Sequence, residues 1–132
     1  MDLGRFDVKA AASEGADLHI KHPMTGEPLF DDGEPVVVRV IGRDSPVVRE
    51  KMAQLDKRKA GGEVLSKDDE GIELFCAVVV GWSHIELDGE VLECNRDSIR
   101  RLMTDPRTEW IGEQVGPFAL NRRNFAKNLP TG

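Results

Sequence analysis

The most constraining feature of this sequence is an abrupt change of residue pattern at the end of its first third. Residues 36–42 are rich in β-branched side chains and favour a β-strand. Ser45 and Pro46 then form a helix start, because Ser45 can accept hydrogen bonds from free backbone amides and Pro46 suits the first helical position. Apolar residues follow at helical spacing, namely Val48, Met52 and Leu55. A strand that leads directly into an amphipathic helix predicts an α+β fold.

The N-terminal part is predicted to contribute a small antiparallel sheet. Residues 18–23 alternate apolar and polar side chains, as a half-buried strand does, and the alternation ends at Pro23. We expect this strand to pair antiparallel with residues 36–41, which makes 17–42 a β-rich region. Residues 1–16 show no sustained period and are predicted to form a flexible arm.

The remainder, residues 45–132, is predicted to be mainly helical and to complete a single domain over 17–132. Ser66 can cap a helix over 67–80, and a buried strand is the alternative there because residues 78–80 are all valine. Asp88-Gly89 between alternating residues indicates a hairpin at 85–92.

Two further helices are expected after the hairpin. Asn95 is predicted to cap the first, and Asp105-Pro106 to start another. The last segment carries one helical stripe, interrupted by an arginine: Ile111, Val115, Phe118, Arg122, Phe125 and Leu129. Because Pro117 lacks a backbone amide hydrogen, we expect a kink or break at that residue.

Composition excludes several classes of function. The 132 residues carry 18 basic and 24 acidic side chains, and this net charge of −6 argues against sequence-independent DNA binding. The longest apolar run, residues 76–80, is too short to span a membrane, and no apolar leader is evident, so we expect a cytoplasmic protein without a membrane partner. Cys76 and Cys94 are expected to be reduced thiols.

Residue patterns that would indicate catalysis or metal binding are weak. No phosphate-binding or dinucleotide-binding glycine motif is present. A Cys76–His84 nucleophile pair, and metal binding by acidic clusters, would make the chain a small enzyme, but capping and turn formation explain these residues better. The clusters are Asp31, Asp32 and Glu34; Asp68, Asp69 and Glu70; and Glu86, Asp88 and Glu90. We therefore predict no catalytic residue, cofactor or metal.

The order of motifs over residues 36–127 resembles the tail assembly chaperones of long-tailed, siphovirus-type bacteriophages. A β-rich segment leads to Gly42-Arg43-Asp44-Ser45 and a charged helix, and a Gly81-Trp82 segment and a hairpin follow. Asn95 then opens a short helix, and the last amphipathic helix ends near Asn124-Phe125. The order and spacing of these motifs carry the resemblance, and residues 1–35 have no counterpart in it.

The resemblance implies a non-enzymatic protein of the host cytoplasm that is absent from the mature virion. Such a chaperone binds the tape measure protein, keeps it soluble and helps to recruit tail tube subunits. The two apolar stripes are the predicted partner-binding residues, and open stripes would also favour self-association: Val48, Met52, Leu55, Ile111, Val115, Phe118 and Phe125. The alternatives are a structural component of the tail or head–tail connector, or a small inhibitor that binds a host protein.

Overall fold

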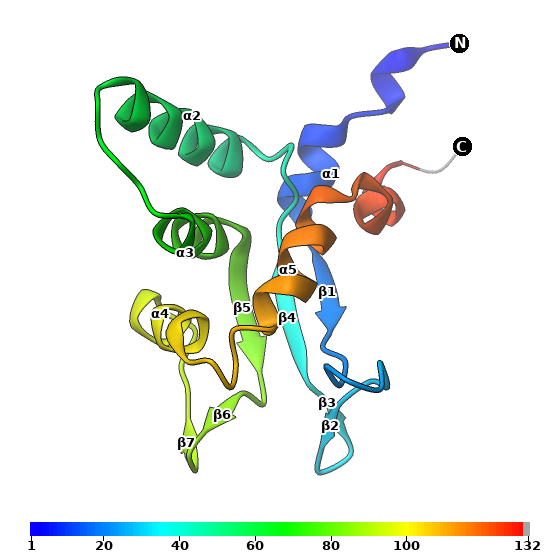
Figure 1. Cartoon of the computed structure of the whole chain (residues 1–132). Coiled ribbons are helices and arrows are strands. Elements are labelled where there is room, and N and C mark those ends of the chain that lie inside the picture. Colours follow the sequence, from blue (N-terminus) through cyan, green and yellow to red (C-terminus); the bar gives the residue numbers. More distant parts are fainter. Residues whose placement is uncertain (131–132) are drawn as a thin grey trace.

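The computed structural model of the chain describes residues 1–130 and has an α+β fold, as predicted (Figure 1). Small antiparallel sheets combine with several helices. The elements in chain order are η1 (Leu3–Arg5), α1 (Val8–Glu14), β1 (Ala16–His19), β2 (Phe30–Asp31), β3 (Glu34–Pro35), β4 (Val37–Val40), α2 (Pro46–Ala60), α3 (Lys67–Val78), β5 (Val79–Ser83), β6 (Glu86–Leu87), β7 (Glu90–Val91), α4 (Arg96–Thr104), α5 (Ile111–Leu120) and η2 (Arg122–Asn128), where η denotes a 3₁₀ helix.

The main sheet has the strand order β1-β4-β5, with antiparallel neighbours. The predicted pairing of the first strand with residues 36–41 is confirmed, because Leu18 lies opposite Val38 in the register. Val38 also lies opposite Trp82 of β5. These residues share the buried face of the sheet, whereas Asp17 and Arg39 form an ion pair on the other face.

Helices cover the buried face of this sheet. Figure 1 shows α5 in front of β4 and β1, with α3 and α4 to one side and α1 beside η2. Apolar residues from the sheet and from these helices form one contiguous core, which includes Val38, Phe75, Leu102, Val115 and Phe125. Within residues 1–130, no helix combines the length and apolar character needed to cross a membrane.

A five-residue connection between β4 and α2, which we call the junction segment (Ile41–Ser45), holds the elements together. The amide of Ile41 donates to the carbonyl of Val78 at the end of α3, and the amide of Gly42 donates to the carbonyl of Ala12 in α1. The amide of Arg43 donates to the carbonyl of Ala119 in α5. The remaining two residues act through side chains: Asp44 binds Arg122 of η2, and Ser45 caps α2. Each residue of the junction segment therefore binds a different element.

The predicted flexible arm over 1–16 is wrong for its second half. Residues 8–14 form α1, whose first turn is capped by the carboxylate of Asp7, and strand β1 begins at Ala16. Ala11 and Ala12 are buried against η2, and Nδ2 of the Asn128 side chain donates to the carbonyls of Ala11 and Gly15. Alanine favours helix and its small side chain permits close packing, so this segment is ordered without a strong apolar period.

Both interpretations of residues 67–80 are partly right. The helix that follows Ser66 ends at Val78, and Val79 then begins strand β5, which pairs with β4. The β-branched valines fit this change because the open edge of β4 supplies hydrogen-bond partners. The predicted hairpin is confirmed, with Asp88 and Gly89 at positive φ between β6 and β7.

The C-terminal region differs from the expected long helix in two places. Asp105-Pro106 begins a turn over residues 106–110 instead of a helix: the Asp105 carbonyl accepts from the amides of Thr108 and Glu109, and α5 begins only at Ile111. Pro117 lies inside α5, and the break occurs later, at Asn121. The extended backbone of Asn121, whose side chain accepts from the Arg123 amide, starts η2 in a new direction.

A matched pair of glycine substitutions tests the importance of the junction segment. A Cβ at Gly42 would lie 2.9 Å from the Cβ of Ala12 and 3.0 Å from Cε2 of Phe125, so Gly42→Ala should lower the free energy of unfolding by about 2 kcal/mol. A Cβ at Gly71 within α3 has no neighbour within 4 Å, so Gly71→Ala should raise it by about 0.5–1 kcal/mol. Urea unfolding of both variants measures the difference, and equal effects would contradict the close packing at Gly42.

Candidate functional site

The predicted stripe on α2 is divided between the core and the surface. Val48 and Leu55 are each 2% exposed, whereas Met52 is 44% exposed. The spacing correctly placed the three residues near one face of the helix, but two of them are occupied by packing within the chain. Met52 alone is available to a partner without rearrangement.

The predicted stripe on the last segment is also mainly core. Ile111, Val115 and Phe125 are 5% exposed or less. Phe118 is half-buried and meets Phe125 edge to face, with 5.9 Å between the ring centroids. Phe118 borders a wider hollow that is lined by both polar and apolar side chains. Five of the seven predicted partner-binding residues, counting Val48 and Leu55, thus have a structural role, and their prediction as an accessible surface is wrong.

An accessible apolar surface that includes only part of the two stripes is a groove of about 380 Å³ between α2, α3, α4 and α5, which we call the apolar groove. The core residues Val48, Phe75 and Val115 border its floor. Residues that line the groove are Arg43, Val48, Met52, Gly71, Leu74, Phe75, Val78, Met103, Glu109, Gly112, Glu113, Val115, Gly116, Ala119 and Leu120. A hollow with a continuous apolar lining and few polar groups is the usual form of a site for an apolar ligand or helix.

The walls of the apolar groove are formed by side chains that remain accessible. Met52 and Leu120 are exposed, and Leu74 and Met103 are half-buried. Methionine side chains are flexible and polarizable, so they adapt to partners of different shape. The periodicity of the sequence did not single out Leu74, Met103 or Leu120 as a site, because each lies beside a stripe instead of on it.

Glycines explain why the groove is hollow. Gly112 and Gly116 lie one turn apart on α5, and Gly71 faces them from α3. A Cβ at Gly71 or Gly116 would meet no atom within 4 Å, so the space in front of these residues is open. Met103 packs against Gly112, where a Cβ would lie 3.0 Å from its Cε. The helical spacing of the α5 glycines was the one signal in the sequence that could have indicated this hollow.

Charged side chains stand at the edge of the apolar groove. Glu109 and Glu113 are exposed on the side of the α4–α5 connection, and Arg43 is exposed on the side of the junction segment. Within residues 1–130 neither Glu109 nor Glu113 forms an ion pair. The groove therefore offers an apolar floor with an acidic border at one end.

Asp44 follows the groove residue Arg43 and links the start of α2 to η2. Asp44 is 2% exposed, and its carboxylate accepts two hydrogen bonds from Arg122, at 2.7 and 3.0 Å, and one from Arg49 at 3.2 Å. The hydrogen bonds from Arg122 lower the pKa of Asp44 to about 2. This pairing explains why an arginine interrupts the apolar stripe of the last segment.

A second, half-buried carboxylate ties together three walls of the groove. Glu73 of α3 binds Lys51 of α2 at 3.2 Å and Arg96 of α4. Its side chain is 13% exposed, and the hydrogen bond from Arg96 lowers its pKa. Helices α2 and α4 are therefore anchored to the same residue of α3, which sets their spacing around the groove.

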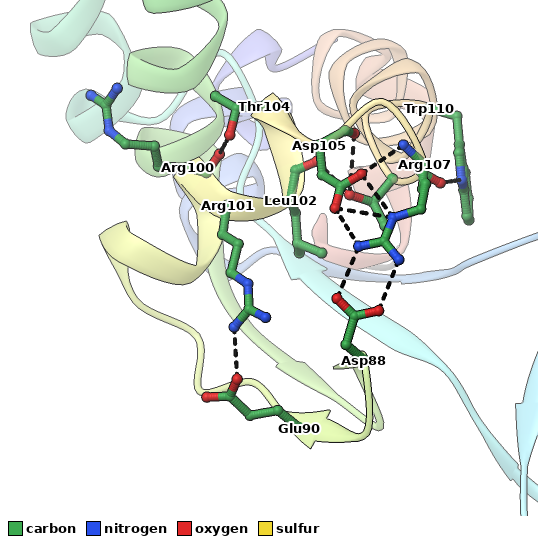
Figure 2. A network of polar contacts seen from close by, with 10 residues as sticks. Asp88, Glu90, Arg100, Arg101, Leu102, Thr104, Asp105, Arg107 and Trp110 are labelled. Atoms are coloured by element: carbon green, nitrogen blue, oxygen red, sulfur yellow. Dashed lines mark hydrogen bonds and ion pairs between the residues drawn. The ribbon is translucent and has the colours of Figure 1, made fainter.

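A surface network positions the α4–α5 connection. Figure 2 shows Arg107 between Asp88 of the hairpin and Asp105, with Nη1 2.8 Å from Oδ1 of Asp88 and Nη2 2.7 Å from Oδ2 of Asp105. Arg107 lowers the pKa of Asp105 to about 2. The carbonyl of Arg107 also accepts a hydrogen bond from the Trp110 indole. Asp88 thus pairs with Arg107, and Glu90 pairs with Arg101. Both residues belong to an acidic cluster that resembled a metal-binding site in the sequence, and both are bound by arginines.

The candidate nucleophile pair has separate surroundings. Burial raises the pKa of the Cys76 thiol, which opposes formation of the nucleophilic thiolate. His84 lies in the β5–β6 connection, with Nδ1 3.6 Å from the Asp31 carboxylate. The Nε2 atom of His19 hydrogen-bonds the Leu29 carbonyl, and His22 accepts hydrogen bonds from the amides of its own turn. Among residues 1–130, no three His, Cys, Asp or Glu side chains are placed to hold one metal ion.

Comparisons of the chain with protein-family models, with curated proteins and with solved structures give no match. The resemblance to tail assembly chaperones therefore rests on the order of the motifs along this chain. The class defined by the structure is a small α+β protein with an apolar groove between four helices.

The Asp44 pairing predicts a specific dependence of stability on pH. Lowering of its pKa from 3.8 to about 2 corresponds to about 2 kcal/mol of stability at neutral pH, which Asp44→Asn should remove. Because the folded state favours the carboxylate, this contribution is complete above the ordinary pKa and is lost as pH falls from about 4 to about 2. The difference in unfolding free energy between wild type and Asp44→Asn should shrink across that range, as measured by urea unfolding.

Glu109→Gln is the matched control for this measurement. It removes an exposed carboxylate that forms no ion pair within residues 1–130 and should leave the unfolding free energy nearly unchanged. Other carboxylates with lowered pKa values, such as Glu73, are present in both proteins and cancel in the difference. A constant difference between wild type and Asp44→Asn from neutral pH down to about 2 would contradict the prediction.

Proposed function

We propose that this protein is a non-enzymatic tail assembly chaperone of a long-tailed bacteriophage, which binds an amphipathic helix of the tape measure protein in the apolar groove. The observation that carries the proposal is the groove itself. Its apolar lining is bordered by accessible side chains of Met52, Leu74, Met103 and Leu120. The motif order over residues 36–127 supports the same family and supplies the identity of the client.

Helix-in-groove binding suits both partners. A long helical client that exposes apolar stripes aggregates unless those stripes are covered, and an amphipathic helix places its apolar face in a hydrophobic groove through residues at i, i+3 and i+4. Met52 and Met103 can adjust to successive stripes of differing shape, so one groove can serve many segments of a long client.

The proposed binding surface is formed by the walls of the groove and includes only part of the predicted stripes. Of the seven residues predicted from the sequence, Met52 supplies direct contact, and Val48 and Val115 support it from the floor. Leu74, Met103 and Leu120 were not predicted and complete the contact surface. In this proposal the complex forms in the host cytoplasm, recruits tail tube subunits and is released before the virion is complete.

Co-expression with the tape measure protein tests the proposal. Met52→Asp and Leu120→Asp place a charge on exposed positions of the groove, so the protein should stay folded while the soluble fraction of the client falls several-fold. The control is Val47→Asp, at an exposed residue of the same helix α2 that does not line the groove. The measurement is the soluble client fraction, with circular dichroism to establish folding of each variant.

The variants and the wild-type protein test two different claims, the role of the groove and the chaperone function itself. Equal client solubility with wild type, Met52→Asp and Val47→Asp would remove the groove from the mechanism. Client solubility that does not change when the wild-type protein is added would overturn the chaperone function as a whole.

Mass analysis of purified virions tests the other part of the proposal. A chaperone that is released should be absent from the particle, whereas a structural component of the tail or connector should be present at a fixed ratio to the tube protein. Detection at such a ratio would replace the chaperone with the structural alternative.

A further inference from the structure

The apolar groove carries charges of opposite sign at its two ends. Arg43 lines the end beside the junction segment, and Glu109 and Glu113 line the end beside the α4–α5 connection. All three residues are exposed, and within residues 1–130 none of them forms an ion pair. The other residues that line the groove are uncharged. These charges are therefore available to a partner that lies in the groove.

A group of arginines strengthens the positive end of the groove. Arg43 also lines an adjoining hollow, together with Arg49 and Arg122. The side chains of Arg49 and Arg122 are more than half exposed although both bind Asp44, because that carboxylate is itself buried. Asp56 is the one exposed acidic residue that lines the hollow. Cations therefore outnumber anions at this end, where a carboxylate of a partner can accept hydrogen bonds from guanidinium groups.

Helix α5 sets the distance between the two charged ends. The Arg43 amide donates to the carbonyl of Ala119 near the end of this helix, whereas Glu109 precedes the helix and Glu113 lies in its first turn. The ten residues of α5 span about 15 Å, at about 1.5 Å per residue. A partner helix covers that distance in about three turns, so residues about eleven positions apart on one of its faces can reach both ends.

We propose that the apolar groove selects an amphipathic helix that carries an anion at one end of its apolar stripe and a cation about three turns away, at the other end. The anion lies over Arg43 and the neighbouring arginines, and the cation lies against Glu109 and Glu113. This selection rests on the proposed function, because it specifies the charge pattern of the client helix that the groove binds.

The apolar lining and the charged ends have different roles in this selection. Apolar contact supplies affinity for any amphipathic helix, and it does not distinguish one register from another along a long stripe. Charges at both ends of the groove favour the register in which both of them are paired. Because exposed ion pairs contribute modestly, a helix with a mismatched end should bind a few-fold more weakly instead of losing its binding altogether.

Titration of the full chain at low salt with synthetic helical peptides tests the charge pattern. Three peptides share one apolar stripe and carry, eleven positions apart, lysine and glutamate, two lysines, or two glutamates. Arg43→Glu should weaken binding of the lysine–glutamate peptide about threefold or more, and it should bind the two-lysine peptide more tightly than wild type does. Glu109→Lys, at the other end of the groove, should likewise weaken binding of the lysine–glutamate peptide and improve binding of the two-glutamate peptide.

Arg5→Glu is the matched control, because it makes the same change of charge in η1, which Figure 1 shows leaving the body beside α1. It should leave the order of the three affinities unchanged, and circular dichroism establishes folding of each variant. An equal effect of Arg5→Glu and Arg43→Glu would overturn the proposal, since net charge alone would then set the affinity. Equal affinity of wild type for all three peptides, with binding lost in Met52→Asp, would overturn the charge selection and leave the groove as a helix-binding site. If wild type binds none of the peptides, the selection is overturned, and client solubility decides the proposed function separately.

Discussion

The hydrogen bonds of the junction segment are the constraint on which the rest of the structure depends. Between the end of β4 and the start of α2, the backbone amides of Ile41, Gly42 and Arg43 bind α3, α1 and α5 in turn. Asp44 adds η2 through Arg122. The absence of a side chain at Gly42 lets α1 and the Phe125 ring approach from opposite directions. Four elements that are distant in the sequence are thereby fixed to one short connection, and buried donors that would otherwise cost free energy are paired.

The apolar groove is a consequence of this arrangement. The junction segment brings α2 and α5 together, and Glu73 attaches both α2 and α4 to α3, so the helices surround a common space. That space would normally be filled by side chains, since protein interiors are closely packed. Gly71 and Gly116 leave it open instead. The hollow therefore needs two conditions: polar contacts that fix the helices around a common space, and glycines that supply no side-chain atoms to fill it.

The sequence predicts the elements of this fold better than it predicts the site. Local signals placed strand β4, the cap at Ser45 and the Asp88-Gly89 hairpin, because each depends on residues that are neighbours in the chain. Helical periodicity also found the apolar face that contains Val48 and Val115. Periodicity indicates that one face of a helix is apolar, but it does not show whether the same chain or a partner covers that face. Buried residues such as Val48 and Val115 were therefore predicted as an interface. Leu74 and Met103 became wall residues only through the tertiary packing of α3 and α4 beside α5, which no local pattern encodes.

The distribution of exposed apolar side chains explains how such a protein can remain dispersed. Leu3 and Phe6 lie on and beside the N-terminal 3₁₀ turn, and Met52 and Leu120 border the groove on another part of the surface. Dividing exposed apolar side chains between separate parts of the surface limits the area of each apolar patch. The net charge of −6 also opposes indiscriminate contact between copies. The groove can therefore keep its apolar lining accessible without making the whole surface prone to aggregation.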